Sequence, residues 1–446
     1  MSSRPAGTSW GSLALPAGYG LTLLLGVALG AVWLDRAEPS AEQRWTTAVA
    51  DASGAFTGSG LLRREPGLSY GPAGKRALAT LAMAGALSHM VFGSLAALRL
   101  WRSLGWAGGV SKDAPSRAAL WMCIAAVVLL IGGVVWSGGW RWATGHADGF
   151  EPAWLAGVSD TAQLGIAWDT VSLEARTAHG VREMDLLAMV PAAGATSLGA
   201  AVLFGWLRGW RGARRAVAWW LAVWLLGVVL LASVTVFGQL RAQAGIGITS
   251  GAELAEPLTT GTMMQGVGQA VHGATDARSI GAVEPERDAE RFARWVLAGL
   301  GGATGGAAGG LGAVWLSVVW VGRRGGAGGD VTQAQVIRRQ VARAKSALLG
   351  LLVSLGALVG AGAFALMLVE GEGPGLAGWL EAAWSAVTQC GLARGSVLGV
   401  GGVTRFGAGG LAGLAVLGRW VPIAWMCWAA AGGGRDDRTA SGGGPY

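Results

Sequence analysis

Four short apolar segments of the chain each end at a glycine: Gly60, Gly165, Gly281 and Gly391. Glycine adopts positive φ at little steric cost and lets backbones approach closely, so it can direct a carbonyl oxygen toward a shared axis. A ring of such carbonyls replaces the water shell of a cation. The four segments together predict one central site in which backbone oxygens coordinate a dehydrated cation.

Side chains beside these glycines complete the predicted ion filter. They are Thr57, Ser59, Gln163, Leu164, Ser279, Ile280, Gln389 and Cys390. Because the chain holds 78 glycines among its 446 residues, a single match is equally compatible with an ordinary turn or packing glycine. The agreement of four segments in the same position favours a shared site.

The segments that carry the glycines are too short to cross a membrane. The segment from Leu376 to Thr388 has about a dozen residues, which gives roughly 18 Å of helix against the roughly 30 Å of a hydrocarbon core. A half-span that turns back leaves carbonyls at membrane depth, which is tolerated where they line a water-filled path or are buried in protein. The pattern is therefore typical of pore loops.

Longer apolar segments surround the short ones and are long enough to span a bilayer. With 52% hydrophobic and 13% charged residues, the composition is that of an integral membrane protein. The predicted spans are residues 15–34, 75–100, 118–136, 181–207, 216–237, 291–321, 346–369 and 411–428. We therefore predict an all-α membrane protein with eight transmembrane helices, arranged as four helix–pore-loop–helix repeats around a central pore.

The repeats divide the chain into four units of similar size. Their boundaries are residues 1–110, 111–215, 216–330, which includes a glycine-rich gating loop, and 331–446, which ends in a short cytoplasmic tail. Internal repeats of this kind imply that each unit contributes an equivalent quarter of one site. The first 33 residues have the charge and apolar core of a signal peptide but no clear cleavage site, so we expect a retained first helix.

The charges are sorted between the two sides of the predicted membrane. Residues 99–118, 208–215 and 322–345 hold fourteen Lys and Arg residues against two acids, Asp113 and Asp330. This distribution follows the positive-inside rule and places both termini in the cytoplasm. It also accounts for the net charge of +8 without nucleic acid as a partner. The acidic outer loops are expected to attract cations.

The sequence lacks the patterns that enzymes, metal centres and disulfide frameworks require. Its three cysteines, Cys123, Cys390 and Cys427, lie in apolar segments, and its four histidines show no metal-ligand spacing. No paired carboxylates and no nucleophile–base set lie within the spans. We therefore expect no enzymatic activity, no bound cofactor and no metal beyond a transported ion.

Two features of the second half predict a gate. Residues 299–312 are so rich in glycine that a straight helix is poorly supported, and the span should break or flex there. Arg419 lies in the middle of an apolar span, where an unpaired charge costs about 2.5–3.5 kcal/mol, so it should face the bundle interior. The predicted gate residues are Gly301, Gly302, Thr304, Gly305, Gly306, Gly309, Gly310 and Arg419. Small-residue helix packing and a structural arginine that caps carbonyls are the alternatives.

These motifs resemble the membrane subunit of Trk/Ktr-type potassium transporters over about residues 15–431. The match is clearest in the fourth repeat, at Ser385-Ala386-Val387 through Gly391-Leu392 and at Leu417-Gly418-Arg419 with Pro422. Arg278-Ser279-Ile280-Gly281 resembles the third filter of that family and Thr57-Gly58-Ser59-Gly60-Leu61 the first. The chain departs from the family at Gly312, where a lysine is common, and at Gln163-Leu164-Gly165, which lacks the usual asparagine.

The resemblance implies potassium uptake across the inner (plasma) membrane by a homodimer with a cytosolic nucleotide-binding regulatory ring. The run from Gly301 to Leu311 would be the family's intramembrane gate, and a glycine at position 60 favours potassium over sodium. A transport-inactive membrane scaffold or regulatory subunit that retains the fold is the alternative hypothesis. Cation flux through the purified protein separates the two.

Overall fold

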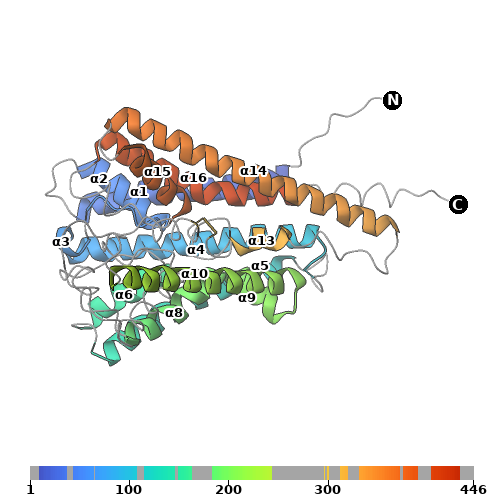
Figure 1. Cartoon of the computed structure of the whole chain (residues 1–446), viewed down its shortest axis with the longest axis horizontal. Coiled ribbons are helices and arrows are strands. Elements are labelled where there is room, and N and C mark those ends of the chain that lie inside the picture. The colour runs from blue at the N-terminus through green and yellow to red at the C-terminus, as the bar shows by residue number, and fades with distance from the viewer. Residues whose placement is uncertain are drawn as a thin grey trace.

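The chain folds into a bundle of helices that lie roughly along one common direction (Figure 1). The computed structural model describes residues 10–37, 44–64, 66–107, 115–145, 149–162, 183–243, 296, 299–300, 312–319, 331–371, 375–389 and 403–431. These residues form helices and turns and include no strand, so the predicted all-α class is confirmed.

The first two predicted repeats, residues 1–110 and 111–215, each contain a long helix, a short helix and a returning helical segment. The first repeat consists of α1 (Trp10–Ala37), α2 (Arg44–Phe56), the single turn α3 (Pro66–Ser69) and α4 (Pro72–Ser103). The second repeat consists of α5 (Pro115–Ala143), α6 (Phe150–Ala162), α8 (Glu183–Leu198) and α9 (Ala200–Leu207). The two short helices, α2 and α6, have 13 residues each and correspond to predicted half-spans.

The second half of the chain contains the helices of the other two predicted repeats. The third unit contains α10 (Arg211–Gln243) and α13 (Ala313–Val319), and the predicted half-span at residues 257–281 lies outside the described residues. The fourth unit consists of α14 (Val331–Glu370), α15 (Gly375–Thr388) and α16 (Arg405–Ala430). The 40-residue α14 begins well before its predicted span and extends past the neighbouring helices (Figure 1).

Several helices have the length and surface of membrane spans. Within the described residues, five segments are long and apolar enough to cross a bilayer: residues 13–37, 72–103, 117–143, 338–370 and 405–430. Large apolar side chains on α1, α5 and α14 face outward, among them Leu24, Val128 and Val353. Exposed apolar surface on this scale is suited to lipid. The chain is therefore a multi-pass membrane protein, and eight spans stay a prediction.

Helices α4 and α16 join the repeats to one another. Helix α16 packs against α1, α2 and α4 of the first repeat as well as α14 and α15 of its own. Helix α4 contacts α5, α6 and α9 of the second repeat. The short helices α2, α6 and α15 lie toward one end of the bundle, opposite the start of α1 and the end of α16 (Figure 1).

The returning segment of the second repeat differs from the single helix predicted for residues 181–207. It breaks at Gly199, whose φ of 75° and ψ of 158° are not helical, and separates α8 from α9. The freed N–H of Ala201 donates to the Ser94 hydroxyl of α4 at 3.1 Å. Backbone groups released inside a membrane require such a partner, and the side chain of α4 supplies it.

Candidate functional site

Residues 57–61, which we call the first filter segment, follow α2 and turn sharply at two glycines. Gly58 has a φ of 72° and Gly60 a φ of 63°, a left-handed backbone that other residues rarely adopt. The Gly60 N–H donates to the Gly54 carbonyl at 3.1 Å. The Thr57 hydroxyl donates to the Ser53 carbonyl at 2.7 Å. These bonds fix the buried segment to the last turn of α2.

Helix α4 lies directly behind the first filter segment. A Cβ at Gly85 of α4 would sit 1.7 Å from the Phe56 carbonyl oxygen, a distance that no side chain permits. Glycine at this position therefore allows the two backbones to touch. The contact places the carbonyl end of α2 at a fixed depth in the bundle.

Arg419 extends from the middle of α16 to the first filter segment. Its side chain is 3% exposed, and its Nε donates to the Thr57 carbonyl at 2.5 Å. One terminal guanidinium nitrogen lies 2.7 Å from the position that a Cβ on Gly58 would occupy, so glycine there makes room for the arginine. A cationic group of the fourth repeat thus binds a backbone carbonyl of the first.

The end of α15 packs against α16 one turn from this contact. Gln389 follows α15 with a φ of 64°, and its side-chain amide donates to the Ala386 and Ala415 carbonyls at 2.7 and 2.8 Å. A Cβ at Gly418 would lie 2.2 Å from the Val387 carbonyl oxygen. The carbonyl end of α15 therefore touches the residue next to Arg419.

The end of α6 reaches the same place from the second repeat. The Ala162 carbonyl oxygen, on the last residue of α6, lies 3.7 Å from the Cβ position of Gly58. Three short helices thus direct their carbonyl ends toward the first filter segment and Arg419. Helix carbonyl ends carry a partial negative charge of about one half, so the arrangement attracts a cation.

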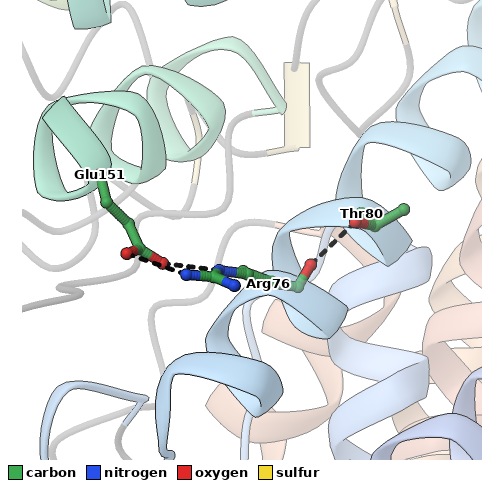
Figure 2. Close-up of polar contacts among 3 residues, drawn as sticks. All are labelled: Arg76, Thr80 and Glu151. Carbon is green, nitrogen blue, oxygen red and sulfur yellow. Dashed lines mark hydrogen bonds and ion pairs between the residues drawn. The ribbon is translucent and has the colours of Figure 1, made fainter.

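Ionic contacts hold α6 against its neighbours. At its exposed first turn, Glu151 accepts hydrogen bonds from the Arg76 guanidinium of α4 at 2.8 and 3.2 Å, as Figure 2 shows. The hydrogen bond from Arg76 lowers the pKa of the Glu151 carboxyl. Deeper, Arg141 of α5 forms an ion pair with Asp160 of α6 at 2.6 Å, and the Ser137 hydroxyl also donates to Asp160. These contacts set the direction of α6.

Asp51, on α2, holds the chain that leaves the first filter segment. Its fully buried carboxylate accepts the Arg63 N–H at 2.5 Å and the Tyr70 hydroxyl, and Arg64 Nε lies 3.9 Å away. Hydrogen bonds to an ionised carboxylate are stronger than hydrogen bonds between two neutral groups. Asp51 therefore ties the chain that follows the first filter segment back to α2, the helix that precedes the segment.

The described ends of the glycine-rich stretch meet. The Gly312 N–H donates to the Leu300 carbonyl at 3.1 Å, and Gly312 has a φ of 76° immediately before α13. A regular helix would not pair residues twelve positions apart. The two described ends of the stretch are therefore in direct hydrogen-bond contact. Gly299, next to this point, packs on Trp384 of α15.

Five of the sequence-predicted site residues lie in the described part of the chain, and all are buried: Thr57, Ser59, Gly60, Gln389 and Arg419. The structure brings Arg419 and the first filter segment together. The other predicted residues lie outside the described residues: Gln163, Leu164, Gly165, Ser279, Ile280, Gly281, Cys390, Gly391, Gly301, Gly302, Thr304, Gly305, Gly306, Gly309 and Gly310. Their roles stay predictions.

Sequence analysis missed two residues that shape the site. Asp51 is an acid within a half-span that is otherwise mostly apolar or small, and that isolation is a signal for a buried partner. Gly85 offers no such signal, because one glycine among many in α4 looks like any packing glycine. Only its distance from Phe56 identifies it.

Comparison with known proteins shows a similarity of fold. No known sequence family matches the chain. No curated protein matches it either. Its fold is similar to that in the crystal structure of the potassium transporter TrkH from Vibrio parahaemolyticus, with a TM-score of 0.62 and 15% identity. The similarity covers 92% of this chain and 84% of that one, so the two share a TrkH-like fold.

Proposed function

We propose that the protein carries monovalent cations, potassium foremost, into the cell through a pore between its four repeats. The observation that supports the proposal most is the meeting of the carbonyl ends of α2, α6 and α15 around the first filter segment. Gly60, Gly165, Gly281 and Gly391 each supply one position of the filter in this proposal. The likeness to a potassium transporter supports the same assignment.

The transport mechanism needs no covalent chemistry. A cation that enters from the acidic outer side loses water and gains backbone carbonyls in exchange. The partial negative charges at the ends of three short helices offset the cost of that dehydration. The membrane potential, which contributes about 2.3 kcal/mol per charge per 100 mV, drives the ion inward.

Arg419 controls passage at the inner side of the filter in this proposal. Its guanidinium binds the Thr57 carbonyl, an oxygen that is then no longer available to an ion at that level. Its charge also repels a cation there. The predicted gate loop, residues 301–310, would act together with it.

The surroundings of the pore follow from the same proposal. The protein would reside in the inner membrane with both termini in the cytoplasm, form a homodimer, and bind a cytosolic nucleotide-binding ring. It would need no resident cofactor and would catalyse no reaction, since potassium is its cargo.

Flux through the purified protein in liposomes tests the function. Vesicles of neutral and anionic lipid that contain the protein and are loaded with potassium should release potassium under an imposed potential. Vesicles loaded with the same concentration of sodium should release sodium more slowly. Vesicles with protein that are no more permeable than empty ones would reject the transporter and favour the transport-inactive scaffold. Equal rates for both ions would reject potassium preference alone.

A further inference from the structure

The turn between α9 and α10 carries a cluster of basic side chains that the pore does not use. Its members, which we call the arginine turn, are Arg208, Arg211, Arg214 and Arg215. Three are exposed, and none forms an ion pair with a carboxylate within the part of the chain that the structure describes. The turn lies at the same end of the bundle as the start of α1 and the end of α16 (Figure 1).

Aromatic rings beneath the turn fix two of the guanidinium groups. Arg208 lies over the Phe204 ring at 5.4 Å, and Arg215 lies over the Trp106 ring at 4.9 Å. Trp210 packs edge-on against Phe204 and completes the aromatic layer beneath the turn. A guanidinium that stacks through its face keeps its in-plane N–H groups for an oxyanion. One terminal nitrogen of Arg215 is buried and has no hydrogen-bond partner among the residues that the structure describes.

The backbone of the turn is held in one conformation. Gly209 has a φ of 71°, and the Trp210 N–H donates to the Gly205 carbonyl at 2.8 Å. A Cβ on Gly205 would lie 2.7 Å from both Ala213 and Trp210, so α9 and α10 meet closely there. The arginines are therefore presented from a fixed frame, which limits the entropy lost when a ligand binds.

Exposed apolar residues lie immediately beside the basic ones. Trp206 is 49% exposed and Leu207 is 71% exposed, although α9 is otherwise largely buried. In a membrane protein, tryptophan next to arginine marks the level of the lipid headgroups, with the apolar side chains toward the acyl chains. A ligand that satisfies both kinds of side chain has a phosphate and a hydrocarbon tail.

We propose that the arginine turn is a binding site for the phosphate headgroup of an anionic phospholipid. Trp206 and Leu207 contact the upper acyl chains, and the guanidinium groups bind the phosphate oxygens. Clusters of basic side chains at the membrane surface and basic pockets between helices are known types of binding site for such headgroups. The site is independent of the transported ion, so its test does not depend on flux.

Native mass spectrometry of the full chain, titrated with phosphatidylglycerol or phosphatidylcholine, measures this binding directly. We expect at least one phosphatidylglycerol to bind well before phosphatidylcholine does. Each basic side chain near a lipid surface contributes about fivefold to affinity, so Arg208→Gln/Arg211→Gln should bind about 25-fold more weakly. The matched control is Arg338→Gln/Arg339→Gln, which removes two exposed charges from α14.

Three results would overturn the proposal. Equal affinity of the wild type for the two lipids means no headgroup selection. If Arg208→Gln/Arg211→Gln and the control Arg338→Gln/Arg339→Gln lose phosphatidylglycerol affinity equally, the lipid is attracted to basic surfaces in general. Inorganic phosphate can be added in a thermal melt. If it raises the melting temperature of the wild type but not of Arg208→Gln/Arg211→Gln, and lipid gives no further rise, the ligand is a soluble anion instead. If the double variant does not fold, Arg211→Gln, at an exposed position, should still show about a fivefold loss of affinity.

Discussion

Replacing Arg419 with glutamine should raise cation flux, provided that the protein folds. The arginine binds the Thr57 carbonyl at 2.5 Å in a buried setting, beside the proposed filter. Glutamine keeps an N–H donor for nearby carbonyls and removes the charge. The variant therefore separates the electrostatic barrier from the structural role of the side chain.

The size of the effect follows from the distance between two like charges. At separations of about 4 to 8 Å and an effective dielectric constant near 20, two unit charges repel by about 2 to 4 kcal/mol. This range corresponds to roughly 30-fold to 1000-fold in the occupancy of the nearest ion position. Because water in the pore screens part of the repulsion, we expect a rise of about tenfold or more.

Rubidium uptake into liposomes at fixed protein density is the assay. Arg419→Lys is the matched control, since it keeps the charge and should leave flux within about threefold of the wild type. The loss of a charge-assisted hydrogen bond lowers stability by about 1.5–3 kcal/mol, so each variant must first elute as a single species with a cooperative melting transition. Unchanged or reduced flux in a folded Arg419→Gln variant would refute the role of the charge.

Three further outcomes are expected. Gly85→Ala should prevent stable folding, because its methyl group would sit 1.7 Å from a carbonyl oxygen, whereas Gly132→Ala, with open space around it, should keep the wild-type melting temperature or raise it slightly. Because Asp51 holds the chain that follows the first filter segment, Asp51→Asn should lower the selectivity for potassium over sodium, measured as a bi-ionic potential. An unchanged permeability ratio would count against this role of Asp51. Potassium should slow labelling of Cys390 by small cationic thiol reagents added outside; equal rates would indicate a cysteine buried by packing.

The placement of the helices could be predicted from local sequence. Runs of apolar residues set the spans, and the short second segments follow from glycine after about a dozen apolar residues. For α6, the predicted half-span of 151–165 compares with Phe150–Ala162 in the structure. The burial of Arg419 also followed from the cost of an unpaired charge at membrane depth.

Contacts between distant parts of the chain could not be predicted. Arg419 and Thr57 are separated by 362 positions in the sequence, and no local pattern pairs them. Near the break at Gly199, the N–H of Ala201 donates to the hydroxyl of Ser94 on α4. These two residues are 107 positions apart in the sequence. Such partners are chosen by packing in three dimensions, whereas periodicity and propensity describe only neighbours along the chain.

The central claim is that backbone carbonyls at the ends of the short helices coordinate a dehydrated monovalent cation. An experimental structure with rubidium or thallium in place of potassium tests it most directly, because these ions give strong anomalous scattering. We expect a peak on the bundle axis, coordinated by carbonyls of the first filter segment and by those of the other predicted repeats. A saturating soak that leaves this position empty, or that places the ion on another surface, would contradict it.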